Sequence, residues 1–199
     1  MSLEKLPFIS FFLLTLILTG RILYLRKKQG EPDAKSNKKL VRNRWLAAIF
    51  LIITVLWIFE LSRAALGFSL ELLPDFLTNL LTNSHYLKGF GAVYIVLGLF
   101  GFVLTLIHFG TSLRFGLNKK KKGKLVTSGI FSLSRNPFFL SLECYFLGIT
   151  FMLPSIFFIV FTLSAFISIH FVILKEERFL AENYGNEYLN YQQQTRRYF

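Results

Sequence analysis

The chain has 199 residues, of which 53% are hydrophobic and 24 are phenylalanine, more apolar residues than a soluble core of this size needs. The formal net charge is +12, but the basic residues lie beside long apolar blocks. We therefore interpret the charge as topology control and attraction to anionic lipid headgroups, and we expect no nucleic-acid partner. The single cysteine, Cys144, excludes an internal disulfide and any cysteine cluster for zinc or iron–sulfur.

Apolar blocks follow one another along the chain at 6–25, 45–59, 89–113, 138–153 and 155–174. Since about 20 apolar residues cross a hydrocarbon core of about 30 Å, these blocks predict five transmembrane helices. The fourth block is short and is followed by Pro154, which cannot continue the hydrogen-bond ladder of a helix. The last two blocks therefore predict a tight helical hairpin. The first block has no small-residue cleavage site, so we expect an anchor that is retained.

The basic residues set the expected orientation. Residues 26–44 and 114–135 are rich in Lys and Arg, whereas 60–85 holds Arg63 against three acidic residues. By the positive-inside rule, the N-terminus lies outside, and both basic loops and the C-terminal tail are cytoplasmic. We expect a multi-pass protein of a bacterial inner membrane or an equivalent membrane.

The tail after Leu174 changes character. Leu180, Tyr184, Tyr188 and Tyr191 form an amphipathic stripe that can lie on the bilayer surface or cap the helices. The predicted fold is thus an all-α integral membrane protein with five transmembrane helices, the last two a tight hairpin, and an amphipathic cytoplasmic helical tail. We expect one domain over 1–199, with three N-terminal spans in 1–113 and the loop, hairpin and tail in 114–199.

Two polar motifs bracket the hairpin and emerge on the same side of the membrane. The first reads Leu-Val-Thr-Ser-Gly-Ile-Phe at 125–131 and Ser-Arg-Asn-Pro at 134–137. The second reads Glu-Glu-Arg-Phe-Leu at 176–180 and Tyr-Gly-Asn-Glu-Tyr at 184–188. Together they resemble the C-terminal half of the isoprenylcysteine carboxyl methyltransferase family, a pattern shared by phospholipid methyltransferases and other small membrane methyltransferases. The resemblance covers about 124–199.

This resemblance implies an S-adenosylmethionine site formed by the loop, the hairpin and the tail, with a lipid-accessible opening for a lipophilic or prenylated acceptor. It implies no metal. The implied catalytic residues are Arg135 and Glu176. The implied cofactor-binding residues are Lys124, Leu125, Val126, Phe131, Asn136, Pro137, Phe138, Phe139 and Glu176.

The chain departs from the family pattern at several positions. Asn136 stands where the family has histidine, and Asn does not titrate near neutral pH. Phe131 and Phe139 replace tyrosines and lose a hydroxyl group. Gly123 replaces a histidine, and Val172 falls where eukaryotic members have an arginine tied to substrate handling.

Three further residues are candidates on the acceptor side: Glu143, His170 and Val172. An acid inside a predicted span is a functional hypothesis by default, and Glu143 lies seven residues after Asn136 on the same helix face. It could contact the cofactor or the acceptor, or pair with a basic side chain. His170 could be a packing residue or a proton carrier, and Glu176 and Glu177 could form surface pairs with Lys175 and Arg178.

We therefore predict an S-adenosylmethionine-dependent methyltransferase that acts on a lipophilic acceptor. A carboxylate acceptor is already ionised at neutral pH, so its methylation needs only proximity and alignment. Two alternatives remain open. One is a membrane reductase that resembles the sterol reductases and uses a nicotinamide cofactor, and the other is a non-catalytic family member that acts as a membrane scaffold.

Overall fold

The structure is a computed structural model that describes residues 3–29, 44–110 and 125–198. Within these residues every regular element is a helix, which confirms the predicted all-α class. The elements in chain order are η1 (Leu3–Lys5), α1 (Leu6–Gln29), α3 (Arg44–Leu66), α4 (Asp75–Thr78), α5 (His85–Phe109), η3 (Gly129–Ser132), α6 (Pro137–Met152), α7 (Ile156–Tyr184) and α8 (Asn186–Gln194).

Four of the described helices, namely α1, α3, α5 and α7, are long and apolar enough to cross a membrane. The helix α6 is also apolar but has only 16 residues. The chain is thus a membrane-embedded, multi-pass helical protein.

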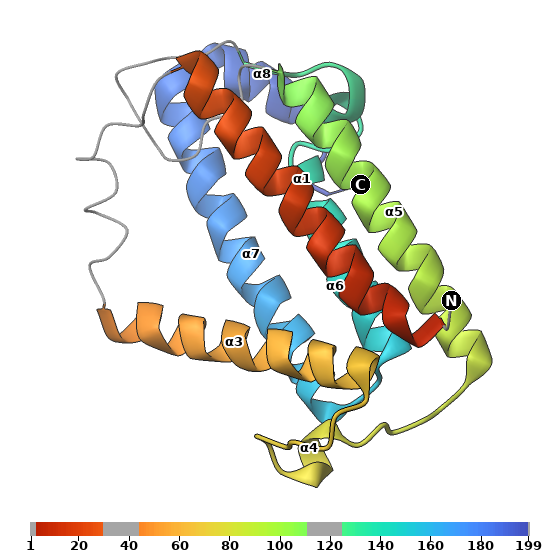
Figure 1. The fold of residues 1–199 in the computed structure, drawn as a ribbon. Coiled ribbons are helices and arrows are strands. Elements are labelled where there is room, and N and C mark those ends of the chain that lie inside the picture. Colours follow the sequence, from red (N-terminus) through yellow and green to blue (C-terminus); the bar gives the residue numbers. More distant parts are fainter. Residues whose placement is uncertain (1–2, 30–43, 111–124, 199) are drawn as a thin grey trace.

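The helices α1, α5, α6 and α7 run lengthwise in one bundle (Figure 1). The short helix α8 lies across the end of the bundle at which α7 ends. The helix α3 crosses the bundle at a steep angle near the opposite end, where it contacts η1 and α1. The polar motifs on either side of the hairpin therefore lie at the α8 end.

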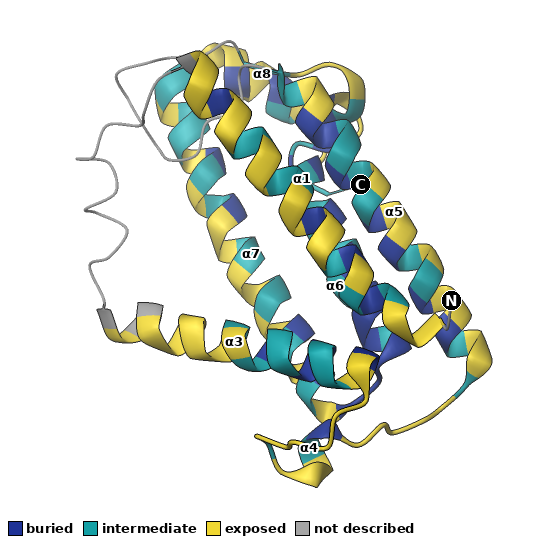
Figure 2. Cartoon of the chain, viewed as in Figure 1, coloured by how far each residue is buried: buried dark blue, intermediate teal, exposed yellow. Residues whose placement is uncertain are grey.

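The helix α3 is attached through its C-terminal half. The Trp57 ring packs against Phe11 of α1 and stacks on Phe161 of α7, with ring centroids 5.2 Å apart in both pairs. Trp57 is 3% exposed, whereas Trp45 at the other end of α3 is 81% exposed. Figure 2 shows the same change from exposed to buried along α3. Aromatic contacts at one end thus hold this helix to the bundle.

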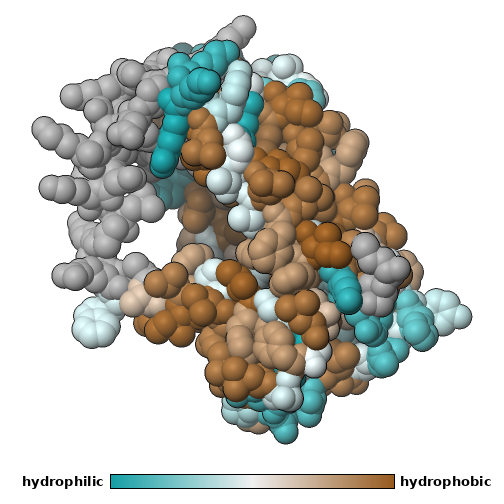
Figure 3. Space-filling model, viewed as in Figure 1, coloured by the Kyte–Doolittle hydropathy of each residue, from teal (hydrophilic) through white to brown (hydrophobic). Residues whose placement is uncertain are grey.

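The sides of the bundle are apolar and exposed. Large side chains such as Leu16, Phe100 and Phe171 lie on its surface, and hydrophobic residues cover much of the visible face in Figure 3. Soluble monomers rarely expose contiguous apolar patches of this kind. These surfaces are suited to lipid tails.

The helices α5 and α6 approach each other closely because glycines line their contact. A Cβ atom on Gly98 would lie 2.8 Å from the backbone nitrogen of Tyr145 and 2.9 Å from the carbonyl oxygen of Ser141. Gly148 on α6 has a similar close contact with the backbone of Ile95. Small residues that let two backbones approach are the usual basis of helix packing in membranes.

We predict that Gly98→Ala destabilises the protein, because the new methyl group meets backbone atoms that cannot rotate away. Overpacking of this kind costs about 1–3 kcal/mol, so thermal unfolding in detergent should show a lower Tm. Gly89→Ala is the matched control, because no atom lies within 4 Å of its new Cβ. A Gly98→Ala protein as stable as the Gly89→Ala protein would contradict the close-packing account.

Candidate functional site

A buried carboxylate joins the two polar motifs at the α8 end of the bundle. We call Ser134, Arg135, Asn136, Glu177 and Arg197 the Glu177 cluster. The Glu177 side chain is 6% exposed and lies between two guanidinium groups. Its Oε1 accepts hydrogen bonds from Arg135 Nε and Asn136 Nδ2, both at 3.1 Å. Its Oε2 accepts hydrogen bonds from Arg197 Nη2 at 2.9 Å and Nε at 3.1 Å.

This arrangement satisfies the buried charge. A buried carboxylate is tolerated when it is paired and when its oxygen lone pairs accept good hydrogen bonds. The two-pronged contact with Arg197 is the strong, charge-assisted kind. The hydrogen bond to Glu177 also raises the pKa of the Arg197 guanidinium above its ordinary value. Hydrogen bonds and ion pairs together therefore hold the Glu177 carboxylate in place.

The segment after α8 is bound to the start of the hairpin by the same cluster. Arg135 Nη1 donates to the carbonyl oxygens of Thr195, at 2.8 Å, and Gln192, at 3.1 Å. Ser134 Oγ and Asn136 Nδ2 both donate to the carbonyl oxygen of Arg197. Since Arg135 points its donors at Glu177 and at this segment, it positions the tail.

The two motifs meet, as their placement on one side of the membrane predicted, but they meet through Glu177 rather than Glu176. The interpretation of Glu177 as a surface partner of Lys175 or Arg178 is wrong, since Glu177 is buried against Arg135 and Arg197. Glu176 is half-buried on α7. Successive residues of an α-helix point about 100° apart, because a turn takes about 3.6 residues, so only one of the two acids can face Arg135.

The loop before the hairpin is anchored by aromatic packing. Phe131 is buried, its ring centroid lies 4.7 Å from that of Phe109, and its carbonyl oxygen accepts a hydrogen bond from Tyr191 Oη at 2.5 Å. Gly129 has a φ of 67° and packs against the His108 ring, so a side chain there would collide with it.

The other implied cofactor residues are placed as follows. Pro137 is buried, and the ring of Phe138 packs on Phe102 in the core. Asn136 stands at the N-cap position of α6, but its side chain makes no cap hydrogen bond. The residues Leu125, Val126 and Phe139 are half-buried, and Lys124 lies outside the described residues.

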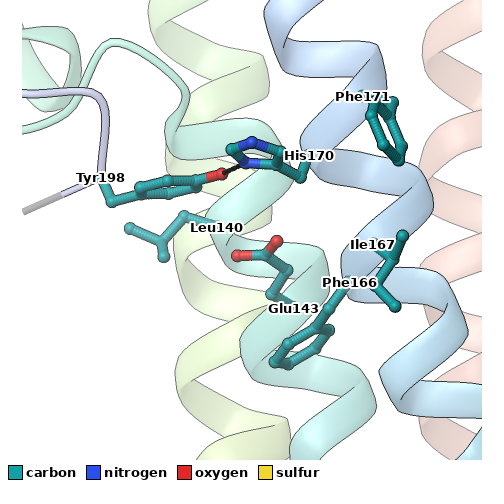
Figure 4. Close-up of a pocket in the computed structure, with 7 residues that line it drawn as sticks. All are labelled: Leu140, Glu143, Phe166, Ile167, His170, Phe171 and Tyr198. Atoms are coloured by element: carbon teal, nitrogen blue, oxygen red, sulfur yellow. Dashed lines mark hydrogen bonds between the residues drawn. The ribbon is translucent and has the colours of Figure 1, made fainter.

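A cavity of about 520 Å³ lies between α6 and α7 (Figure 4). Its volume falls within the roughly 300–1,000 Å³ that small-molecule sites have. The lining residues are Leu140, Glu143, Phe166, Ile167, His170, Phe171 and Tyr198. Phe171 is 65% exposed, so the cavity opens toward the lipid-facing side of the bundle.

The polar groups of the cavity come from three elements: α6, α7 and the tail. His170 Nδ1 and Tyr198 Oη lie 2.6 Å apart and share a hydrogen bond. Burial raises the pKa of the Tyr198 phenol and the charge of Glu143 adds to the rise, so the phenol is protonated at neutral pH. The Glu143 carboxylate points toward this pair (Figure 4). Within the described part of the chain it has neither a hydrogen bond nor an ion pair.

The structure thus brings Glu143 and His170 to one cavity but leaves Val172 out of it. Val172 is 48% exposed on α7 and does not line the cavity. Tyr198 and Arg197, which the sequence analysis missed, complete the cavity and the Glu177 cluster respectively. Neither belongs to a motif, and the only sequence signal was their position after the amphipathic stripe.

The cavity and the Glu177 cluster lie along the same two helices. Glu143 follows Asn136 by seven residues on α6, and His170 precedes Glu177 by seven residues on α7. Seven residues of helix span about 10 Å. The neighbouring side chains of Arg197 and Tyr198 connect the two, since Arg197 binds Glu177 and Tyr198 binds His170.

Comparison with known proteins gives a fold and a family. A solved structure, of the eukaryotic intramembrane Ras methyltransferase isoprenylcysteine carboxyl methyltransferase, resembles the chain with a TM-score of 0.56 and 20% sequence identity. The match covers 88% of this chain and 58% of that one, so this chain spans little more than half the length of that protein. No individually curated protein matches the sequence.

A family model matches the part of the chain that carries the two motifs. The model of the phospholipid methyltransferase family matches residues 86–187, slightly more than half of the chain. The matched range includes α5, the hairpin, the first motif and most of the second. The chain belongs to the phospholipid methyltransferase family.

Proposed function

We propose that this protein is an S-adenosylmethionine-dependent methyltransferase that acts on a lipophilic acceptor at the membrane. The observation that carries this proposal is the cavity between α6 and α7, which opens on the lipid side and is lined by the polar side chains of Glu143, His170 and Tyr198. Six of its seven lining residues lie within the range matched by the phospholipid methyltransferase family.

The chemistry of the cavity suits a sulfonium cofactor. Its lining holds one carboxylate and several aromatic faces, and neither Lys nor Arg is among the lining residues. A cation is attracted both to aromatic faces and to a carboxylate in a site of low dielectric. When bound, S-adenosylmethionine would supply an electrophilic methyl group there.

The proposed cofactor side of the groove lies beside the Glu177 cluster. Leu125, Val126 and Phe139 are half-buried and would offer apolar contacts. Asn136 has a side-chain oxygen that makes no hydrogen bond within the described chain, and the acid Glu176 directly precedes Glu177 on α7. The buried residues Phe131 and Pro137 and the half-buried Phe138 would support this wall from behind, and Arg135 would position it through Glu177.

The acceptor side of the groove is open to lipid. Ile167 and Phe171 line the cavity and are largely exposed on α7. An apolar acceptor can therefore reach the polar end from the bilayer without crossing water. The protein then contributes proximity and orientation, which can supply about 7–11 kcal/mol of a reaction barrier.

The proposed topology keeps five spans, with α6 as the short fourth span. At about 1.5 Å per residue, the 16 residues of α6 extend about 24 Å, less than a hydrocarbon core of about 30 Å. The 29 residues of α7 extend well beyond such a core and carry the second motif out of it. With the N-terminus outside, the Glu177 cluster faces the cytoplasm, where S-adenosylmethionine is made available.

Cofactor binding by the purified full-length chain in detergent tests the proposed function. We expect binding of S-adenosylmethionine and S-adenosylhomocysteine by isothermal titration calorimetry, and no binding of NADPH. Binding of NADPH alone would support a reductase, and binding of none of the three would support a scaffold, so either result would refute the proposal.

The neighbouring acids of α7 should behave differently when they are neutralised. We predict that Glu176→Gln weakens binding of S-adenosylhomocysteine and leaves the Tm unchanged, because Glu176 lies on the proposed cofactor side and outside the Glu177 cluster. Calorimetry gives the affinity, and a melt of the same sample gives the Tm. The exposed Glu187→Gln on α8 is the control for loss of one negative charge. Equal affinities of all three proteins would remove Glu176 from the site.

In contrast, Glu177→Gln should lower the Tm strongly. It leaves Arg135 and Arg197 without their carboxylate, and loss of one partner of a buried ion pair costs about 3–5 kcal/mol. The tail should also detach, which limited proteolysis followed by mass spectrometry would detect as new cleavage between α8 and Arg197. A stable, protease-resistant Glu177→Gln protein would show that the cluster does not hold the tail.

A further inference from the structure

We propose that the segment after α8 is a strap that has to be released before a polar ligand can enter or leave the cavity. The strap is residues 195–198, and its Tyr198 lines the cavity. This inference rests on the proposed function and adds how the same site is opened. It is carried by the position of the strap and by the kind of contacts that hold it.

The strap lies on the α8 side of the cavity. In Figure 4 the Tyr198 phenol reaches from the strap to His170, above the Glu143 carboxylate. His170 is about one helical turn nearer to α8 than Phe166, which also lines the cavity. The other approach, past the exposed Phe171, leads to lipid. Since a charged nucleoside is costly to transfer through hydrocarbon, it has to come from the α8 end, where the strap is bound.

Polar contacts hold the strap, whereas buried rings hold α8. The Arg135 backbone N–H donates to the carbonyl oxygen of Arg196 at 3.0 Å, and other donors of residues 134–136 bind the strap in the same way. On α8, Tyr188 is 1% exposed and Tyr191 is 6% exposed. Water can replace a hydrogen-bond partner at a small net cost, but it cannot replace ring burial. The strap can therefore open while α8 stays in place.

The Glu177 carboxylate stays paired when the strap opens. Two guanidinium groups contact this one carboxylate, that of Arg135 at 3.0 Å and that of Arg197 at 2.9 Å. The Arg197 side chain is already 36% exposed, so on release it moves into water. Glu177 keeps Arg135 and the hydrogen bond from Asn136. Release of the strap thus leaves no buried charge without a partner, and the bundle remains folded.

The strap controls the rates of binding rather than the affinity. When it closes over the empty and the occupied cavity alike, the fraction of time that it is open multiplies both the association and the dissociation rate constants. Weakening the closed strap therefore raises both rate constants and leaves their ratio, the Kd, unchanged. A side chain that only contacts the ligand acts differently, because its loss raises the dissociation rate constant and the Kd together.

Binding kinetics of S-adenosylhomocysteine test this proposal, measured by surface plasmon resonance on the full-length protein in detergent. Arg197→Gln loses the ion pair with Glu177, so we expect both rate constants to rise about tenfold, with less than about a twofold change in Kd. Arg196→Gln is the matched control, because it removes the same charge from an exposed position of the strap. It should keep both rate constants.

Tyr198→Phe is a second, milder variant. It keeps the ring and loses only the hydroxyl group that shares a hydrogen bond with His170. We expect both rate constants to rise by a smaller factor, about threefold, again with an unchanged Kd. This variant decides the matter if Arg197→Gln does not fold.

Hydrogen exchange measures release of the strap without a ligand. The Arg135 amide donates to the Arg196 carbonyl oxygen, so it exchanges when the strap is open. In the ligand-free protein, mass spectrometry should show faster exchange of this amide in Arg197→Gln than in the wild type and in Arg196→Gln. The amides of α5 and α6 should exchange at the same rate in all three proteins.

These two measurements separate the strap from the proposed function. If S-adenosylhomocysteine binds but only its dissociation rate constant rises in Arg197→Gln and Tyr198→Phe, the strap is a ligand contact and the proposal is wrong. Unchanged rate constants, or an Arg135 amide that exchanges no faster in Arg197→Gln, would also overturn it. If the amide responds as expected but the wild type binds no S-adenosylhomocysteine, the proposed function fails, and with it the role of the strap for this ligand.

Discussion

The Glu177 carboxylate is the contact on which the functional half of the molecule depends. It lies between Arg135 from the start of the hairpin and Arg197 from the tail, and it also accepts a hydrogen bond from Asn136. A buried charge is expensive unless every lone pair is satisfied, so the three donors and the carboxylate require each other. This mutual requirement determines how the loop, α7 and the tail are arranged.

The arrangement has a consequence for the cavity. Once Arg197 is bound to Glu177, the next side chain, Tyr198, lies within reach of His170 two turns along α7. The tail thus supplies a wall of the cavity although it is far from the hairpin in sequence. The Glu177 cluster and the cavity are consequently coupled, and loss of the Glu177 carboxylate should also displace the Tyr198 side chain.

Close packing of α5 on α6 is the second constraint. Gly98 and Gly148 let the two backbones touch, which holds α6 firmly on one side and leaves its other side for α7 and the cavity. A polar contact between Thr150 and Thr162, 2.7 Å apart, joins α6 to α7 beyond the cavity. The cavity therefore lies between helices whose spacing is set by contacts on either side of it.

The sequence was the better guide where local properties decide the structure. Hydropathy predicted the helical membrane class, and the positions of the motifs predicted that Arg135 and Asn136 would meet the second motif. It was wrong about Glu177, because two adjacent acids have the same composition and differ only in the face of α7 on which they lie. It also missed Arg197 and Tyr198, since neither residue belongs to a motif that would indicate its partner.

The amino-acid sequence by itself determined the apolar segments, the family pattern and the two motifs, because each of these depends on residues close together along the chain. The tertiary structure alone decided which acid is buried, that the tail contributes Tyr198 to the cavity, and that Glu143 and His170 share this cavity. These facts depend on how each helix is rotated about its axis and on contacts between distant residues. Glu176 and Glu177 point about 100° apart on α7, and packing alone fixes which of them faces Arg135.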